Sequence, residues 1–211
     1  MRLNLLATAF LLAGALAPAQ DYDAKIREYA KLYGNGTDDD LRLRLIDLGD
    51  QDQAVRRYDL DRLNPAQQRW VMEQMKTTDR QLTAQLKEIV AAKGWPTMKL
   101  VGVYACEDAA RVLVHSADRE FQRKMAPVVE QLAAKGEIIG TGFAPLIDQL
   151  LLADGKPQRF GTQYTVKDGK AIFEPVEDPD KVDERRAALL LPPMAEYKRQ
   201  IAALYRLQVI N

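Results

Sequence analysis

Apolar residues recur at intervals of three and four positions along most of the chain, which is the spacing of one face of an α-helix. Leu82, Leu86 and Ile89 follow this spacing in the longest such segment, which Asn64 opens as a helix cap and Gly94 closes. Further helices are predicted at residues 22–33, from a cap at Thr37 onward, and at residues 100–116, 119–135, 142–153, 180–189 and 193–206.

The period changes to two after Pro157, where apolar and polar residues alternate as they do in a β-strand. Asp168-Gly169 supplies a two-residue turn of the kind that joins antiparallel strands. The partners predicted across this turn are Val166 with Ala171 and Tyr164 with Phe173, on an apolar side that faces the helices. The pattern therefore predicts a mainly α-helical fold with one β-hairpin near residues 159–175.

The first residues follow the pattern of a secretory signal peptide. Arg2 precedes an apolar run from Leu5 to Leu16, and small residues follow at Ala17-Pro18-Ala19. The run is shorter than the roughly 18 residues of a membrane-spanning helix, although an uncleaved anchor is the alternative. We expect cleavage after Ala19, with residues 20–211 as one secreted or periplasmic domain and no membrane span.

Charge and cysteine content narrow the classes of partner. The chain holds 30 basic and 30 acidic residues without a basic block, so a nucleic acid is not an expected partner. Cys106 is the only cysteine, which leaves no intrachain disulfide. Its helical neighbours Val103 and Ala110 are apolar, and this predicts an inert buried thiol.

The rarest residue types exclude several mechanisms, because the chain has one histidine, His115, and one serine, Ser116. A Ser-His-Asp triad would need a hydrogen bond between these neighbours, yet neighbouring residues of a helix point about 100° apart. A zinc site lacks its nitrogen and sulfur ligands. We predict no metal ligands and no cofactor, although the many carboxylates leave an oxygen-ligated divalent metal open.

His115 is the leading candidate for chemistry. Steps of three and four residues place Tyr104, Asp108 and Arg111 on the same side of its helix. An imidazole with a carboxylate, a guanidinium and a phenol beside it can act as a general acid or base. The alternative is an ordinary solvated helix face.

Several short motifs between residues 52 and 197 resemble, in order and spacing, a bacterial family of unknown function, domain of unknown function 6624. These motifs are Asp52-Gln53-x-x-Arg56, Gly94-Trp95-Pro96-Thr97, Val101-Gly102, His115-x-Ala117-Asp118, Gln122, Asp148, Gln158-x-x-Gly161-Thr162-Gln163, Pro175-x-Glu177-Asp178 and Val182-Asp183-x-Arg185-Arg186. The resemblance implies no reaction, but it selects the polar residues that a compact fold can gather in one cleft. His115, Asp118 and Asp148 are the catalytic candidates it implies, and Gln163, Arg186 and Arg56 the candidates for binding a small polar or anionic ligand.

The chain departs from the family pattern at four positions. Val114, Gln149 and Phe160 stand where glutamine, arginine and tyrosine are common, and Leu189 lies near an expected glycine. Two hypotheses follow. In an envelope hydrolase or transferase, His115 moves protons and Asp118 or Asp148 orients it, while Gln163 and Arg186 hold the substrate. In a non-catalytic exported binding or interaction module, the same polar network is structural.

Overall fold

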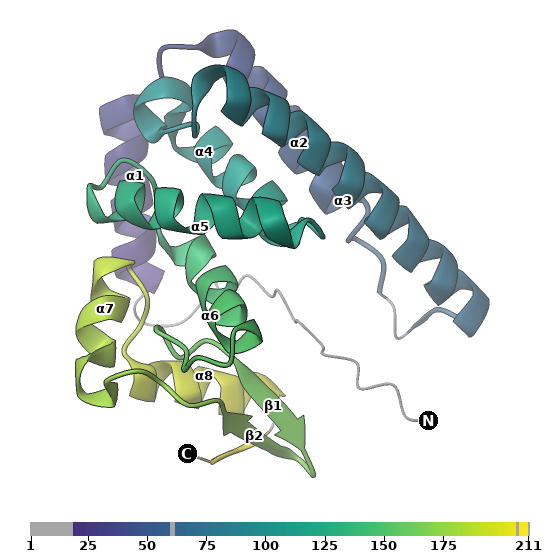
Figure 1. The fold of residues 1–211 in the computed structure, drawn as a ribbon, viewed down its shortest axis with the longest axis vertical. Coiled ribbons are helices and arrows are strands. Elements are labelled where there is room, and N and C mark those ends of the chain that lie inside the picture. The colour runs from purple at the N-terminus through teal and green to yellow at the C-terminus, as the bar shows by residue number, and fades with distance from the viewer. Residues whose placement is uncertain (1–18, 60–61, 206, 211) are drawn as a thin grey trace. The chain divides into compact units, whose positions relative to one another are not determined.

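The computed structural model describes residues 19–59, 62–205 and 207–210, so the predicted signal peptide lies outside the described residues except at Ala19. Two compact units make up the chain. The helical unit lies within residues 26–146, and the C-terminal unit joins the described residues from 147 onward to residues 19–25. The described residues form eight α-helices and one three-stranded sheet (Figure 1), which confirms the predicted fold class.

The helices lie close to their predicted positions. They are α1 (Ala19–Tyr33), α2 (Asp39–Ala54), α3 (Pro65–Lys93), α4 (Met98–His115), α5 (Arg119–Ala134), α6 (Ala144–Ala153), α7 (Val182–Ala188) and α8 (Met194–Tyr205), with 3₁₀ turns at Thr141–Phe143 and Pro179–Lys181.

Local capping explains where two of these helices begin. The Asn64 side chain accepts hydrogen bonds from the backbone N–H groups of Ala66 and Gln67, each at 3.0 Å, and opens α3 as predicted. The prediction that Thr37 caps α2 is wrong. The cap is Asp38, because its carboxylate accepts from the N–H of Leu41 at 3.1 Å.

The core of the helical unit is built around α4. Ten of the 18 residues of α4 are buried, Cys106 among them, as expected of a helix that is apolar on most sides. Helices α2 and α3 both pack against it. Gly49 of α2 lies so near Asp108 of α4 that an added Cβ would stand 2.3 Å from the carboxyl carbon.

A break inside α4 explains the Val101-Gly102 motif. Gly102 has φ 76°, a left-handed value that side chains other than glycine rarely adopt. A Cβ there would also lie 2.6 Å from the carbonyl oxygen of Gly34. This glycine therefore lets the turn after α1 approach the first residues of α4.

The C-terminal unit contains the sheet. Strands β1 (Tyr164–Lys167) and β2 (Lys170–Phe173) pair antiparallel in the predicted register, Tyr164 with Phe173 and Val166 with Ala171. The turn residues Asp168 and Gly169 both have positive φ, as a two-residue hairpin of this type requires. Strand β3 (Gln208–Ile210), which the sequence pattern did not predict, pairs parallel to β2.

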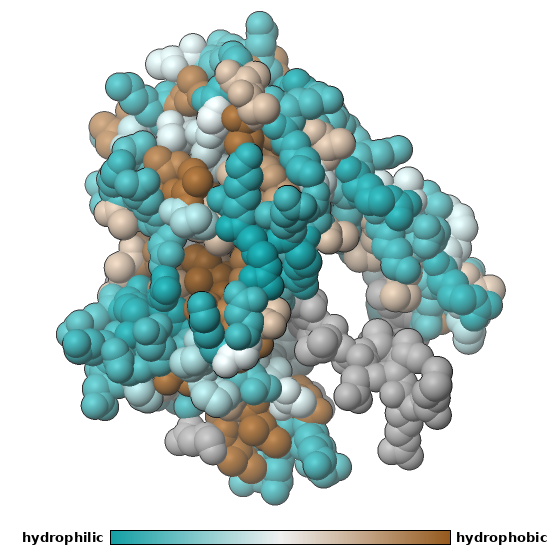
Figure 2. All heavy atoms as spheres, viewed as in Figure 1, coloured by the Kyte–Doolittle hydropathy of each residue, from teal (hydrophilic) through white to brown (hydrophobic). Residues whose placement is uncertain are grey.

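One side of the sheet is covered by α8. Ala171 and Phe173 are buried with Ile201, and Tyr164, Met194 and Tyr197 pack against them. The predicted apolar side does not extend to the end of the hairpin, because Val166 is 55% exposed. Hydrophobic side chains gather over the hairpin at the bottom of Figure 2. The large hydrophobic residues of β1 and β2 that are exposed are Val166 and Ile172.

Within the described part of the chain, no helix has the length and apolar composition needed to cross a bilayer.

Candidate functional site

The candidate residues fall into two separate polar networks, one in each unit. The helical unit holds His115, Asp118 and Arg56, and the C-terminal unit holds the other three, Asp148, Gln163 and Arg186.

In the helical unit, His115 stands at the last position of α4 and contacts a carboxylate of α2. Its Nδ1 lies 2.7 Å from Oδ1 of Asp52, which is fully buried. An ionised carboxylate only accepts hydrogen bonds, so Nδ1 is the donor. In the neutral ring, the lone pair then resides on Nε2.

Arg56 links this pair to a third helix. Its Nη1 lies 2.9 Å from Oδ1 of Asp52, and its Nη2 donates to Oδ1 of Asp79 on α3 at 2.6 Å. Gln53 donates to the other oxygen of Asp52 at 2.8 Å. With both carboxylates ionised, two negative charges face one guanidinium, so a proton gained by His115 would balance the cluster.

The electrostatic environments of the two carboxylates differ. Burial opposes ionisation of Asp52, but the hydrogen bond from His115 and the charges of His115 and Arg56 outweigh it, and its pKa is lowered. Burial dominates at Asp79, where the bond from Arg56 does not compensate, and the pKa is raised. Asp52 is therefore the acid that is held in its charged form beside the imidazole.

A buried glutamine shapes the turn that carries His115. Gln122 of α5 is 1% exposed, and its Nε2 donates to the carbonyl oxygens of Leu113, Val114 and Ser116 at 3.0, 3.1 and 2.9 Å. These carbonyls belong to the end of α4, where intrahelical partners run out. The family residue Gln122 thus fixes the end of the helix that presents His115.

Asp118 has a different position from the one expected of a residue that orients His115. One of its oxygens accepts from the N–H of Phe121 at 2.9 Å and caps α5, and the other is paired with Lys87 of α3. The hydrogen bond from Lys87, followed by that from Phe121, lowers the pKa of Asp118. Its contacts anchor Lys87, while the carboxylate at His115 is Asp52.

Sequence reasoning did not select Asp52 or Asp79 as site residues. A signal was present for Asp52, which lies four residues before Arg56 in the first family motif, the spacing of an ion pair on one helix. Asp79 falls three residues before the buried Leu82, so it is an acid on the apolar side of α3.

In the C-terminal unit, Asp148 of α6 holds the loop of residues 158–163. It is fully buried, and its two oxygens accept four hydrogen bonds. The donors are the N–H of Arg159 at 2.7 Å, the N–H of Phe160 at 2.9 Å, and the N–H and hydroxyl of Thr162 at 2.9 and 2.8 Å. These bonds occupy the acceptor sites of a carboxylate, and they make Asp148 the anchor of this loop.

Arg186 also binds the loop of residues 158–163. It is 1% exposed, and it donates to the carbonyl oxygens of Phe160 and of Pro192, the latter at 2.6 Å. Its guanidinium carbon lies 4.8 Å from the ring centre of Tyr197. Burial lowers the pKa of Arg186. These contacts place the guanidinium in the interior of the unit.

Two glutamines complete the loop. Gln158 is fully buried, donates to the carbonyl oxygen of Gln163 at 3.0 Å and accepts from its N–H at 2.8 Å. The Gln163 side chain donates to the Thr162 hydroxyl at 3.0 Å. Gly161 has φ 68°, and a Cβ there would lie 2.8 Å from the sulfur of Met194. The family motif around Gly161 is therefore a tightly bonded loop.

A metal site and an activated thiol each need particular neighbouring groups. Nowhere in residues 19–59, 62–205 and 207–210 do three or more His, Cys, Asp or Glu side chains gather as a metal site would need. Burial raises the pKa of the Cys106 thiol to about 12, so this cysteine is not an activated nucleophile.

Comparisons with known proteins identify the family and no closer relative. Neither the curated proteins nor the solved structures contain a match to the chain. One family, described as a family of unknown function, DUF6624, matches residues 39–210. This match includes every motif on which the resemblance was based, and the chain therefore belongs to the DUF6624 family.

Proposed function

We propose that the protein is an exported hydrolase or transferase in which the Asp52–His115 pair transfers a proton to and from a polar substrate. The observation that carries this proposal is the 2.7 Å contact between Nδ1 of His115 and a fully buried carboxylate. Such a contact fixes the tautomer and stabilises the imidazolium that forms when the ring accepts a proton. The signal-peptide pattern before Ala19 supports export.

Each residue of the cluster has a definite role in this proposal. Nε2 of His115 is the basic atom of the proposed mechanism, on a side chain that is 12% exposed. Asp52 orients the ring. Arg56 keeps Asp52 ionised and joins it to Asp79, and Gln122 holds the turn.

The second candidate function is a non-catalytic exported binding or interaction module. One observation favours this function. Arg56 and Asp52 connect three helices, and these contacts would stabilise the fold whether or not His115 is catalytic. Asp148 and Arg186 of the C-terminal unit likewise form hydrogen bonds with backbone groups. In this alternative, removal of His115 destabilises the fold and no turnover depends on it.

Substitution at His115 distinguishes the two functions. The purified protein is assayed against a panel of chromogenic esters, phosphoesters and glycosides, together with the variant His115→Gln. We expect turnover by the wild type and a loss of about 10²- to 10⁴-fold in the variant, the usual contribution of a general acid or base. Its free energy of unfolding should fall by less than about 1 kcal/mol.

The control is Tyr104→Phe, an exposed position on the same helix, which should leave turnover unchanged. Turnover that persists in His115→Gln would exclude the proposed mechanism. Absence of turnover across the panel, with a loss of stability on the order of 1–3 kcal/mol in His115→Gln, would favour the structural function.

A further inference from the structure

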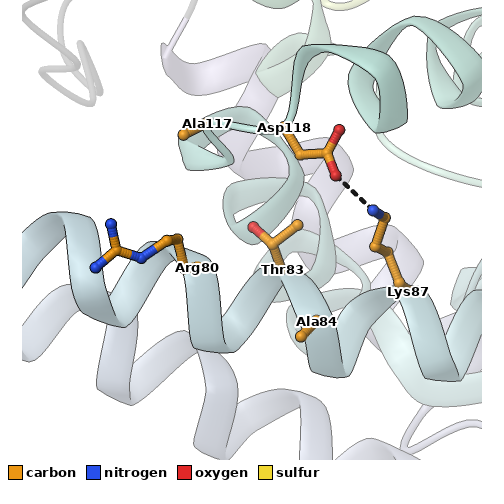
Figure 3. Close-up of a pocket in the computed structure, with 6 residues that line it drawn as sticks. All are labelled: Arg80, Thr83, Ala84, Lys87, Ala117 and Asp118. Carbon is orange, nitrogen blue, oxygen red and sulfur yellow. Dashed lines mark hydrogen bonds and ion pairs between the residues drawn. The ribbon is translucent and has the colours of Figure 1, made fainter.

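A small hollow opens between α3 and the turn that joins α4 to α5 (Figure 3). Its volume is about 150 Å³, well below the roughly 300–1,000 Å³ of a pocket for a drug-sized ligand. It has room for one small chemical group. The lining residues are Arg80, Thr83, Ala84, Lys87, Ala117 and Asp118.

Thr83 provides an unpaired hydroxyl in the wall of this hollow. The residue is 6% exposed, and its Oγ1 has no hydrogen-bond partner in the described part of the chain. Figure 3 shows the side chain directed from α3 toward Ala117 and Asp118. A buried polar atom without a partner is unfavourable and rare in native proteins, so a ligand that bonds to this hydroxyl would remove a defect of the fold.

Lys87 is the charged group of the wall that can attract an anion. Arg80 is turned away from the hollow in Figure 3, and its Nη2 donates to the Thr77 hydroxyl at 3.1 Å and lies 3.9 Å from Glu73. Asp118 brings one negative charge. Both oxygens of Asp118 are already engaged, by the N–H of Phe121 and by Lys87. The Lys87 ammonium also lies 5.5 Å from the ring centre of Phe121. It is therefore held in place at the edge of the hollow, where a second anionic oxygen can share it.

The hollow adjoins the His115 cluster along two chain segments. Ala117 and Asp118 follow His115 by two and three residues, and Thr83 lies one helical turn after Asp79. A group bound to Thr83 and Lys87 would thus be fixed on the turn that His115 begins.

We propose that this hollow binds a single oxyanionic group, a phosphate or a carboxylate, through the Lys87 ammonium and the Thr83 hydroxyl. In the context of the proposed function, on which this role rests, it holds the anionic part of the substrate beside His115. Binding itself requires no turnover and can be measured alone.

Titration with inorganic phosphate, and separately with acetate, tests the site at constant ionic strength. Backbone amide signals are followed by NMR in the purified protein. We expect saturable shifts confined to residues 80–87 and 115–121, and the ion that binds more tightly identifies the group. In Lys87→Gln and in Thr83→Val the affinity should fall about tenfold or more, the loss expected for a charge-assisted hydrogen bond.

Lys93→Gln is the matched control. Lys93 lies on the same helix, is 49% exposed against 47% for Lys87, and is paired with Asp38, which caps α2 as Asp118 caps α5. Its loss should leave anion affinity unchanged. Thr83→Val should fold normally, and its melting temperature without anion should match or exceed that of the wild type, because it removes the unpaired hydroxyl.

Two results would overturn the site: no saturable shift with either ion, or an equal loss of affinity in Lys93→Gln and Lys87→Gln. The proposed function is tested separately, by whether turnover depends on His115. If phosphate binds as described but no turnover depends on His115, the hollow is a binding site and the catalytic proposal fails. If turnover depends on His115 while neither ion binds, the assignment of the hollow fails alone.

Discussion

The two polar networks differ in what their charged groups contact. In the C-terminal unit, Asp148 accepts hydrogen bonds from backbone N–H groups of residues 159–162 and from the Thr162 hydroxyl, and Arg186 donates to the carbonyl oxygens of Phe160 and Pro192. In the helical unit, Asp52, Arg56, Asp79 and His115 contact one another, side chain to side chain, across three helices. The first network fixes the path of a loop, whereas the second gathers charge around a titratable ring.

A protein family can retain a polar residue either because the fold needs it or because the chemistry needs it, and the two networks illustrate this difference. A carboxylate that accepts four backbone and hydroxyl bonds can be replaced only by rebuilding the loop it holds. A carboxylate that orients an imidazole can be replaced with less damage to the fold but with loss of its chemistry. The comparison therefore indicates a structural role for Asp148 and Arg186, and the proposed function gives Asp52 and His115 a catalytic one. Substitutions can test whether the two networks differ in this way.

The largest effect is expected from Asp148→Asn. The amide keeps one acceptor oxygen and turns an NH₂ group toward N–H donors, so buried donors lose their partners. We expect the free energy of unfolding to fall by about 3 kcal/mol or more, measured by urea denaturation at pH 7. Asp154→Asn, at an exposed acid just beyond α6, is the control and should change stability by less than about 0.5 kcal/mol. A loss below 1 kcal/mol in Asp148→Asn would remove the structural assignment.

A smaller and pH-dependent effect is expected from Asp52→Asn. Because the pKa of Asp52 is lowered from its ordinary 3.8, its ionised form stabilises the fold above that pH. This contribution is lost as the pH falls through the lowered folded-state pKa. The variant should be less stable by about 2 kcal/mol at pH 7, and the difference should shrink below about pH 4.

The matching control is Asp47→Asn, an exposed acid of the same helix. Denaturation curves between pH 3 and pH 7 measure both variants. A difference that stays constant over this range would mean that the charge of Asp52 does not stabilise the native state.

The fold was predictable where the determining residues are close in sequence. Asn64 and Gly94 bound α3 as local caps, and the Asp168-Gly169 turn sets the register of the hairpin. Strand β3 was not predictable for two reasons. It is only three residues long, and its parallel pairing with β2 joins residues that are far apart in the sequence. Val166 lies opposite Ala171 as predicted, but it stays 55% exposed at that end of the sheet.

The candidate site was predictable only in part, for the same reason. The sequence singled out His115 from its rarity and Arg56 from its motif. The partner of His115 could not be deduced, because the contact with Asp52 spans 63 residues and depends on how α2 packs against α4. The family motif contained Asp148 and Arg186, but only the structure shows that they bind the loop backbone.

The smallest expected effect concerns Asp108, and it tests whether the helical unit is the one that responds to pH near neutrality. Burial beside Gly49, only partly offset by Arg111 at 2.5 Å, raises the pKa of Asp108 from 3.8 to about 6. An acid whose pKa is raised by folding binds its proton more tightly in the folded state than in the unfolded state. Its contribution to stability is therefore full below about pH 4 and declines as the pH rises to about 6.

Asp108→Asn imitates the protonated acid, so it should be more stable than the wild type by about 1 kcal/mol at pH 7.5. This value is smaller than the full shift implies, because the variant also loses its ion pair with Arg111. The advantage should vanish at pH 4, as measured by urea denaturation at the two pH values. A variant less stable at pH 7.5 would show that the Arg111 pair outweighs burial.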